Sequence, residues 1–164
     1  MDQASAQSGS SAGIEAPLGF FPARVDEKGR LKLPSEIAEY VAALGDQRVF
    51  VTTVNGSTAR IYPISVWRRN ENLLEEVGED TDMKEDVAFV AYHYGAGSDV
   101  DAQGRVLMPT ELRRKLGMEG EQVHLHCFKQ RIEVFGKDVY EQRLAKAMSG
   151  LDTKVTGLEK KGLR

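Results

Sequence analysis

The chain has 164 residues, of which 41% are hydrophobic, and it carries a formal net charge of −3 at pH 7. This length gives room for one or two small domains, and no apolar run approaches the roughly 18 residues that a membrane-spanning helix needs. Residues 1–16 lack the basic start and apolar centre of a signal peptide, and the lone Cys127 excludes an intrachain disulfide, so we expect a cytoplasmic protein.

The N-terminal part of the chain predicts a tail followed by strand, turn, strand and helix. Residues 1–16 are mostly Ser, Ala, Gly and Gln, a composition typical of disorder. Residues 18–25 read as a strand. Asp26 and Gly29 stand at the first and fourth positions of a type I turn, a second short strand follows, and Pro34 suits the first turn of a helix.

The remainder of the first half predicts a helix and a hairpin. Apolar residues after Pro34 recur at helical spacing and stop at Gly45. Residues 47–54 read as a strand, residues 55–56 are an Asn-Gly hairpin turn, and residues 59–62 return as a strand. Ser65 is expected to cap the next helix.

Two helices are predicted in the middle of the chain, at residues 65–79 and 82–94, with a break at residues 78–81. In the first helix the apolar residues expected to face inward are Leu73, Leu74 and Val77. In the second, one face is expected to carry Val87, Val90, Ala91 and Tyr94. The acidic residues concentrated here favour a solvated face over a metal site. They are Glu75, Glu76, Glu79, Asp80, Asp82, Glu85 and Asp86.

The second half of the chain repeats the first. Residues 100–112 align with residues 25–37 without a gap, at an offset of 75, and the Val, Asp, Gly, Arg, Pro and Glu positions are identical. The repeated helix is expected at residues 110–116 and the repeated hairpin at residues 120–135. Later positions match at an offset of 73, and we assign both missing residues to the hairpin, where length changes are tolerated.

The repeated turns hold Arg30 and Arg105 at one fixed place after the turn aspartate. A single surface ion pair of this kind contributes only about 0–1 kcal/mol. Two copies, each followed by the same strand, proline and helix, favour a function for the two arginines over a simple ion pair.

The repeated pattern Val-Asp-x-x-Gly-Arg-φ-x-φ-Pro-x-Glu-φ, where φ is apolar, resembles the signature of SpoVT-AbrB swapped-hairpin domains. Two tandem copies with a helical insert resemble the MraZ family, regulators associated with the bacterial division and cell-wall gene cluster, over about residues 18–147. The resemblance implies a β-rich α+β fold, in which two strand-turn-strand-helix-hairpin-helix repeats form an intrachain pseudo-dimeric β-barrel. The implied division is a tail at 1–16, a first repeat at 17–67, a helical connector at 68–94, a second repeat at 95–148 and a loose C-terminal tail at 149–164.

The resemblance also implies binding to double-stranded DNA. An acidic chain can bind DNA through a clustered basic face, and residues 24–32 have a local basic excess. The residues expected at the DNA are Arg30, Arg105, Lys28, Lys32, Arg24, Gln103, Arg113 and Arg114. The residues expected to shape the turns are Asp26, Gly29, Asp101 and Gly104. For the Arg113–Arg114 pair a solvated helix face stays equally open, because the first repeat has Ala38 and Glu39 there.

The resemblance further implies a ring-like homo-oligomer that binds short direct repeats in promoter DNA and is associated with the nucleoid. No cofactor, metal, membrane or small-molecule substrate is expected, and no catalytic constellation supports an enzyme. His124 and His126 read as structural histidines, and no base is evident for Cys127. The alternative is a protein-interaction module, because AbrB-like folds also serve as antitoxins.

Overall fold

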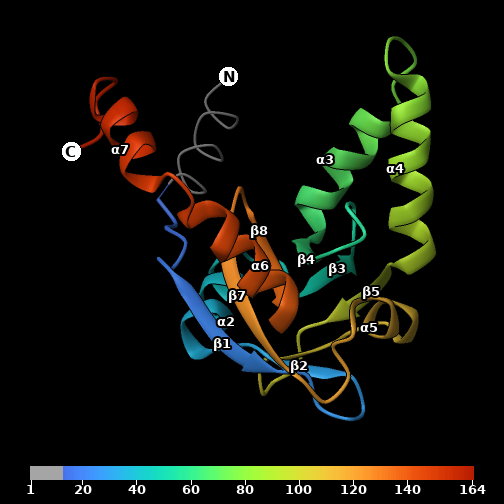
Figure 1. Ribbon diagram of the computed structural model, residues 1–164. Coiled ribbons are helices and arrows are strands. Elements are labelled where there is room, and N and C mark those ends of the chain that lie inside the picture. The colour runs from blue at the N-terminus through green and yellow to red at the C-terminus, as the bar shows by residue number, and fades with distance from the viewer. Residues whose placement is uncertain (1–12) are drawn as a thin grey trace.

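The computed structural model describes residues 13–164 and contains a mixed sheet-and-helix body with two helical arms (Figure 1). The strands are β1 Phe20–Arg24, β2 Arg30–Lys32, β3 Arg48–Thr52, β4 Ala59–Pro63, β5 Ala96–Asp99, β6 Arg105–Leu107, β7 Gln122–Phe128 and β8 Arg131–Gly136. The helices are α2 Ser35–Ala43, α3 Ile64–Glu75, α4 Thr81–Tyr94, α5 Thr110–Leu116, α6 Lys137–Met148 and α7 Leu151–Glu159.

The strands of the two halves are interleaved. The six-stranded sheet has the order β1-β7-β8-β4-β3-β5, so β1 of the first half pairs with β7 of the second, and β5 of the second pairs with β3 of the first. The β4 and β8 strands join the two hairpins at the centre, and β2 pairs with β6 in a separate two-stranded ribbon. All these pairings are antiparallel, and each half completes the sheet of the other.

One continuous apolar core joins the halves. Leu31 of β2 and Val106 of β6 lie opposite each other and are fully buried, because alternate residues of a strand face the same side. Ile37 of α2 and Leu112 of α5 enter the same cluster from the two helices. Since this core draws on both repeats, neither half can bury its apolar face without the other.

The structure confirms the α+β class and the intrachain pairing of the two repeats. It differs from the expected barrel in closure: β1 and β5 are the two open edges of the sheet, and the β2–β6 ribbon is a separate sheet. An isolated bridge between Val25 and Leu31 links β1 to the ribbon. The ribbon strands β2 and β6 are too short to continue the hydrogen-bond ladder of the sheet around the body.

The helices α3 and α4 form an arm that projects from the β3–β4 side of the body (Figure 1). Trp67 of α3 packs on Phe50 and Tyr62 of the sheet, and Ala91 of α4 is fully buried in the same cluster. The helix α3 ends at Glu75, earlier than predicted.

Leu73 and Val77, both expected to face inward on this arm, are exposed, and so is Val87 of α4, at 37%. Leu74 is partly buried against the aromatic cluster, but Leu73 is 56% exposed and Val77 is 97% exposed. The prediction was wrong for Leu73 and Val77, because Leu73 lies about 100° around the helix from Leu74 and Val77 lies beyond the helix end.

Ser65 does not cap α3. The helix follows Pro63, and the Ser65 hydroxyl instead donates a 2.6 Å hydrogen bond to the Asp46 carboxylate.

The strand registers also change the alignment of the repeats. Val25 donates to the Glu121 carbonyl while Val100 donates to the Gln47 carbonyl, so one of the two missing residues falls before β7 and only one falls in the hairpin.

The C-terminal segment is helical where a loose tail was predicted. α7 carries Leu151, Val155 and Leu158 at i, i+4 and i+7, a helical spacing that its Thr and Gly residues obscured. All three side chains are exposed. The N-terminal tail predicted at residues 1–16 lies mostly outside the described residues. None of the helices within residues 13–164 has both the length and the apolar character needed to cross a membrane.

Candidate nucleic-acid interface

The first turn, residues 26–30, is built around the Asp26 carboxylate. One carboxylate oxygen, Oδ1, accepts the backbone N–H groups of Lys28 at 2.9 Å and Arg30 at 2.8 Å. The other, Oδ2, accepts the Arg30 Nε–H at 2.9 Å. The turn closes when the Gly29 N–H donates to the Asp26 carbonyl at 2.9 Å, and Gly29 adopts the left-handed φ of 85° that favours glycine.

The second turn, residues 101–105, repeats this arrangement bond for bond. Asp101 Oδ1 accepts the backbone N–H groups of Gln103 and Arg105, both at 2.9 Å, and Oδ2 accepts the Arg105 Nε–H at 2.9 Å. Gly104 has a φ of 75°. The backbone N–H of Arg30 holds the pKa of Asp26 below its ordinary value of 3.8, and that of Arg105 does the same for Asp101.

Each turn therefore fixes its arginine by Nε and leaves the two terminal Nη groups for another partner. The Arg30 side chain is 40% exposed and the Arg105 side chain is 31% exposed, so both guanidinium groups are accessible. A guanidinium held in this way presents two parallel N–H donors, the geometry that matches a guanine edge or a phosphate.

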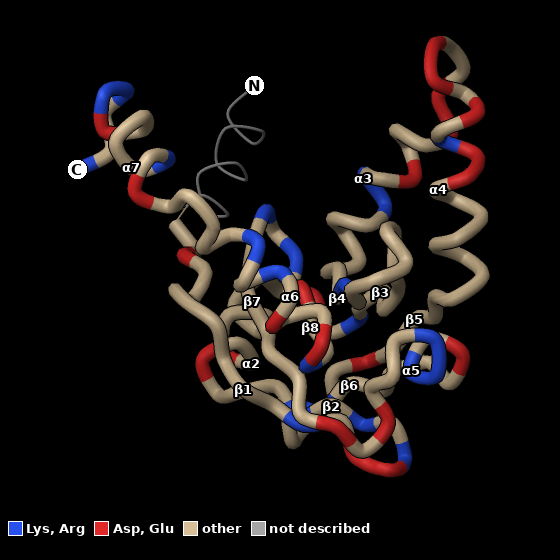
Figure 2. Tube along the Cα trace, in the orientation of Figure 1, with Lys and Arg blue, Asp and Glu red and all other residues tan. Residues whose placement is uncertain are grey.

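The β2–β6 ribbon places the two arginines on one surface. Lys32 lies opposite Arg105 in the register, and Arg30 lies opposite Leu107. Because Leu31 and Val106 point into the core, these four residues face outward, and we call them the outer face of the ribbon. Figure 2 shows basic residues along the ribbon at the lower side of the body, beside acidic residues in the turns.

Sequence reasoning missed Leu107. It is 53% exposed on the outer face, opposite Arg30, and its signal was available as the alternation with the buried Val106. An exposed apolar residue among cations is the kind of group that contacts a thymine methyl.

The other residues expected at the DNA lie around the ribbon. Arg24 ends β1, and Lys28 and Gln103 are at the exposed tips of the first and second turns. Arg114 is exposed on α5, with carboxylates of Glu111 and Glu119 each 3.9 Å from its guanidinium.

Arg113 is placed differently from the prediction. It is only 8% exposed, its Nη1 donates a hydrogen bond to the Met108 carbonyl, and its Nε lies 3.5 Å from the Glu119 carboxylate. The guanidinium is turned inward beneath the first turn. This placement removes Arg113 from the groups that can reach a DNA phosphate.

The two histidines and the cysteine lie on β7 of the six-stranded sheet. His124 stacks on Tyr140 with ring centroids 3.9 Å apart, and His126 stacks on Phe20 at 4.5 Å. Cys127 is 7% exposed, and burial raises the pKa of its thiol to about 11. A thiol with that pKa is overwhelmingly protonated at neutral pH, which leaves it a poor nucleophile.

Comparison with known proteins identifies the family. Residues 97–158 match the model of the family described as "MraZ protein" and as antitoxin-like. A transcriptional regulator MraZ of Acidobacterium capsulatum is 32% identical over 126 residues, which cover 77% of this chain and 86% of that protein. A transcriptional regulator MraZ of Koribacter versatilis is 35% identical over 104 residues, which cover 63% of this chain and 71% of that protein. A transcriptional regulator MraZ of Pediococcus pentosaceus is 28% identical over 137 residues, which cover 82% of this chain and 91% of that protein. The family model matches the second repeat and the C-terminal segment, whereas the first and third relatives match more than three quarters of the chain. The chain belongs to the MraZ family, a family of transcriptional regulators and not of enzymes.

Proposed function

We propose that this protein is a sequence-specific DNA-binding transcriptional regulator that reads duplex DNA with the outer face of the β2–β6 ribbon. The observation that carries the proposal is the register in which Lys32 lies opposite Arg105, with Arg30 two residues away on the same face. The major groove of B-DNA admits a two-stranded β-ribbon, and arginine is the commonest partner of guanine O6 and N7.

The residues of the proposed interface divide into those that read the base sequence and those that position the protein on the DNA. We assign Arg30 and Arg105 to base edges and Leu107 to an apolar base contact. Lys28, Lys32, Arg24, Gln103 and Arg114 are assigned to phosphate or nearby polar contacts, which orient the protein without specifying sequence. Asp26 and Asp101 stay with their arginines and fix the direction of each guanidinium.

The distribution of charge agrees with DNA binding by a chain whose net charge is −3. Most of the acidic residues of the arm lie on α4 and the α3–α4 connection, away from the ribbon (Figure 2). Their repulsion of DNA is weakened at the ribbon, since exposed charges more than about 8 Å apart are largely screened at physiological salt.

The chain assembles, in this proposal, as a ring-like homo-oligomer. Two arms expose apolar side chains: Leu73, Val77, Met83 and Phe89 on the α3–α4 arm, and Leu144, Met148, Leu151 and Leu158 on the α6–α7 arm. The first arm is rich in acidic residues, whereas the end of the second carries Lys160, Lys161 and Arg164. Contact between unlike arms of successive copies is head-to-tail, and such contacts form a ring when the rotation from copy to copy closes.

A ring presents several ribbons at once and would bind short direct repeats, each through weak contacts that gain strength from effective concentration. We propose, from the family resemblance, that the targets lie in the division and cell-wall gene cluster and include the promoter of the protein's own gene. The same proposal places the protein at the nucleoid in the cytoplasm, with residues 17–67 and 95–148 as its two DNA-contacting repeats.

The test is fluorescence anisotropy of a labelled duplex from upstream of the protein's own gene, titrated at several salt concentrations beside a scrambled duplex. Arg30→Ala and Arg105→Ala are each expected to raise Kd about 5- to 150-fold, equivalent to about 1–3 kcal/mol for a bidentate base contact. Arg68→Ala is the matched control. Arg68 is an exposed arginine on α3, and α3 lies in the arm, away from the ribbon (Figure 1).

The proposal is supported if the protein prefers the native duplex, if its affinity falls as salt concentration rises, and if the preference disappears in the turn variants. Equal affinity for the two duplexes, or turn variants that bind like the Arg68 control, would refute it. Protein partners captured from lysate after nuclease treatment would then favour the antitoxin-like interaction module.

A further inference from the structure

The two turns are tied to the rest of the fold by the same backbone bonds. The Met108 N–H donates to the Gly29 carbonyl at 2.8 Å, and the Leu33 N–H donates to the Gly104 carbonyl at 2.9 Å. Each turn is thereby attached to the residue before the proline of the other half. The backbone hydrogen bonds of the two turns therefore obey the pseudo-two-fold relation of the repeats.

The side chains beneath the two turns break that relation. Arg113 lies under the first turn, so close that a Cβ built on Gly29 would be 2.1 Å from its Nη1. Its counterpart at the same position of the first repeat is Ala38, and a Cβ built on Gly104 would meet the Ala38 Cβ at 3.5 Å. A guanidinium fills the space in one half, and a single methyl group faces it in the other.

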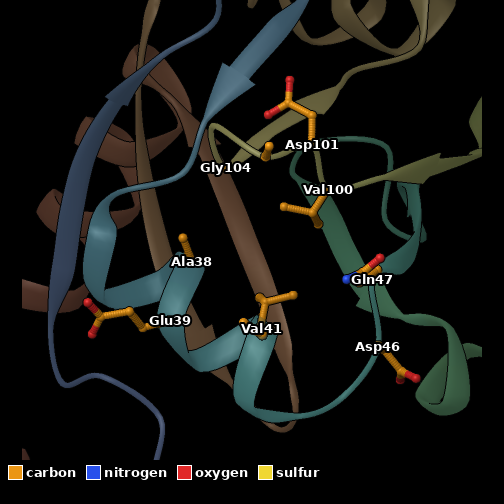
Figure 3. A pocket seen from close by; sticks show the side chains of 10 residues that line it. Ala38, Glu39, Val41, Asp46, Gln47, Val100, Asp101 and Gly104 are labelled. Atoms are coloured by element: carbon orange, nitrogen blue, oxygen red, sulfur yellow. The ribbon is translucent and has the colours of Figure 1, made fainter.

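A hollow of about 300 Å³ remains beneath the second turn. Figure 3 shows Ala38 and Val41 on α2 facing Val100, with Gly104 and Asp101 at the edge of the hollow. The Glu39 side chain is directed away from the centre of the hollow in the same view. No side chain of the first repeat therefore replaces the guanidinium that supports the first turn.

The buried guanidinium restricts how the first turn can move. Arg113 is held by the Met108 carbonyl and by the nearby Glu119 carboxylate, and its 8% exposure leaves it little room to swing away. Any inward displacement of Gly29 would collide with it. The second turn is held by its backbone hydrogen bonds and the turn aspartate, with no guanidinium beneath it, and the hollow leaves space on that side.

We propose that Arg113 is a positioning residue that braces the first turn and holds Arg30 ready for DNA, whereas the second turn is unbraced and presents Arg105 less rigidly. This inference rests on the proposed function, because it assigns a role to Arg113 in DNA reading through Arg30. A group that is already ordered loses less conformational entropy on binding, so the two repeats contribute unequally.

The first test is a double-mutant cycle in DNA binding. Arg113→Met keeps an apolar stem and removes the guanidinium, and Lys115→Met, at an exposed position of the same helix, removes the same charge as a control. Arg113→Met is expected to raise Kd roughly three- to tenfold in the parent and in the Arg105→Ala background, and to add nothing in the Arg30→Ala background.

Equal losses in both backgrounds would overturn the inference, since a direct phosphate contact or a general loss of structure would affect both. A Kd for Arg113→Met that matches the Lys115→Met control would also overturn it.

The second test does not use DNA. Amide hydrogen exchange is expected to be slower at Gly29 and Arg30 than at Gly104 and Arg105, and Arg113→Met should remove the difference. Ala38→Arg supplies a guanidinium beneath the second turn and is expected to slow exchange at Gly104. Equal exchange of the two turns in the parent overturns the bracing. If the parent does not bind DNA at all, the proposed function and the DNA role of Arg113 both fail, and the exchange data decide the bracing alone.

Discussion

The substitutions Gly29→Ala and Gly104→Ala form a matched pair that tests how the two turns are packed. Both glycines have a left-handed φ, at 85° and 75°, and both close the same Asp-x-x-Gly turn. An alanine at either position is strained by about 1–2 kcal/mol, because a Cβ in this region approaches the following carbonyl oxygen.

Only Gly29→Ala carries a further cost. Its Cβ would lie 2.1 Å from Arg113 Nη1, so the guanidinium has to leave its place and give up the hydrogen bond to the Met108 carbonyl. A hydrogen bond from a charged group contributes about 1.5–3 kcal/mol. We therefore expect Gly104→Ala to destabilise the protein by about 1–2 kcal/mol and Gly29→Ala by about 2.5–5 kcal/mol.

The assay is urea unfolding followed by the fluorescence of Trp67, the sole tryptophan of the chain, which is 2% exposed in the native state. All variants are compared at one protein concentration, because assembly shifts apparent stability. The difference between the two substitutions should vanish in an Arg113→Met background. Equal costs in the parent, or a difference that survives Arg113→Met, would refute the packing argument.

Two further outcomes are expected. Because the pKa values of Asp26 and Asp101 are depressed, their contribution to stability is complete above the ordinary value of 3.8 and is lost as pH falls through a lower value. NMR titration of the two carboxyl carbons should give midpoints below 3.8, and a midpoint at or above that value would contradict the turn geometry. The Cys127 thiol, with its pKa of about 11 against an ordinary 9.0, should be alkylated about a hundredfold more slowly at pH 8 than an ordinary thiol. Native and urea-unfolded chains that react at the same rate would contradict its burial.

The repeat and its turns follow from the sequence alone. The Asp and Gly spacing needs only local geometry: an aspartate that accepts its own downstream amides and a glycine that tolerates a positive φ. The apolar pattern around Leu31 and Val106 likewise determines which face of each short strand is buried, since strand residues alternate. Such features depend on neighbours a few residues away, and a single sequence records them directly.

Tertiary structure alone decided what lies beneath each turn. Arg113 and Arg114 are adjacent basic residues that look equally suited to DNA, yet helical geometry points one into the core and the other into solvent. The partner that buries Arg113 is Gly29, more than 80 residues earlier in the chain, and the two meet because the halves exchange strands. The alignment shows Ala38 opposite Arg113, but the resulting hollow appears only once the second turn is folded over α2. A contact made across the interleaved sheets leaves no local periodicity, which is the physical reason why the sequence shows two matching turns but not the different packing beneath them.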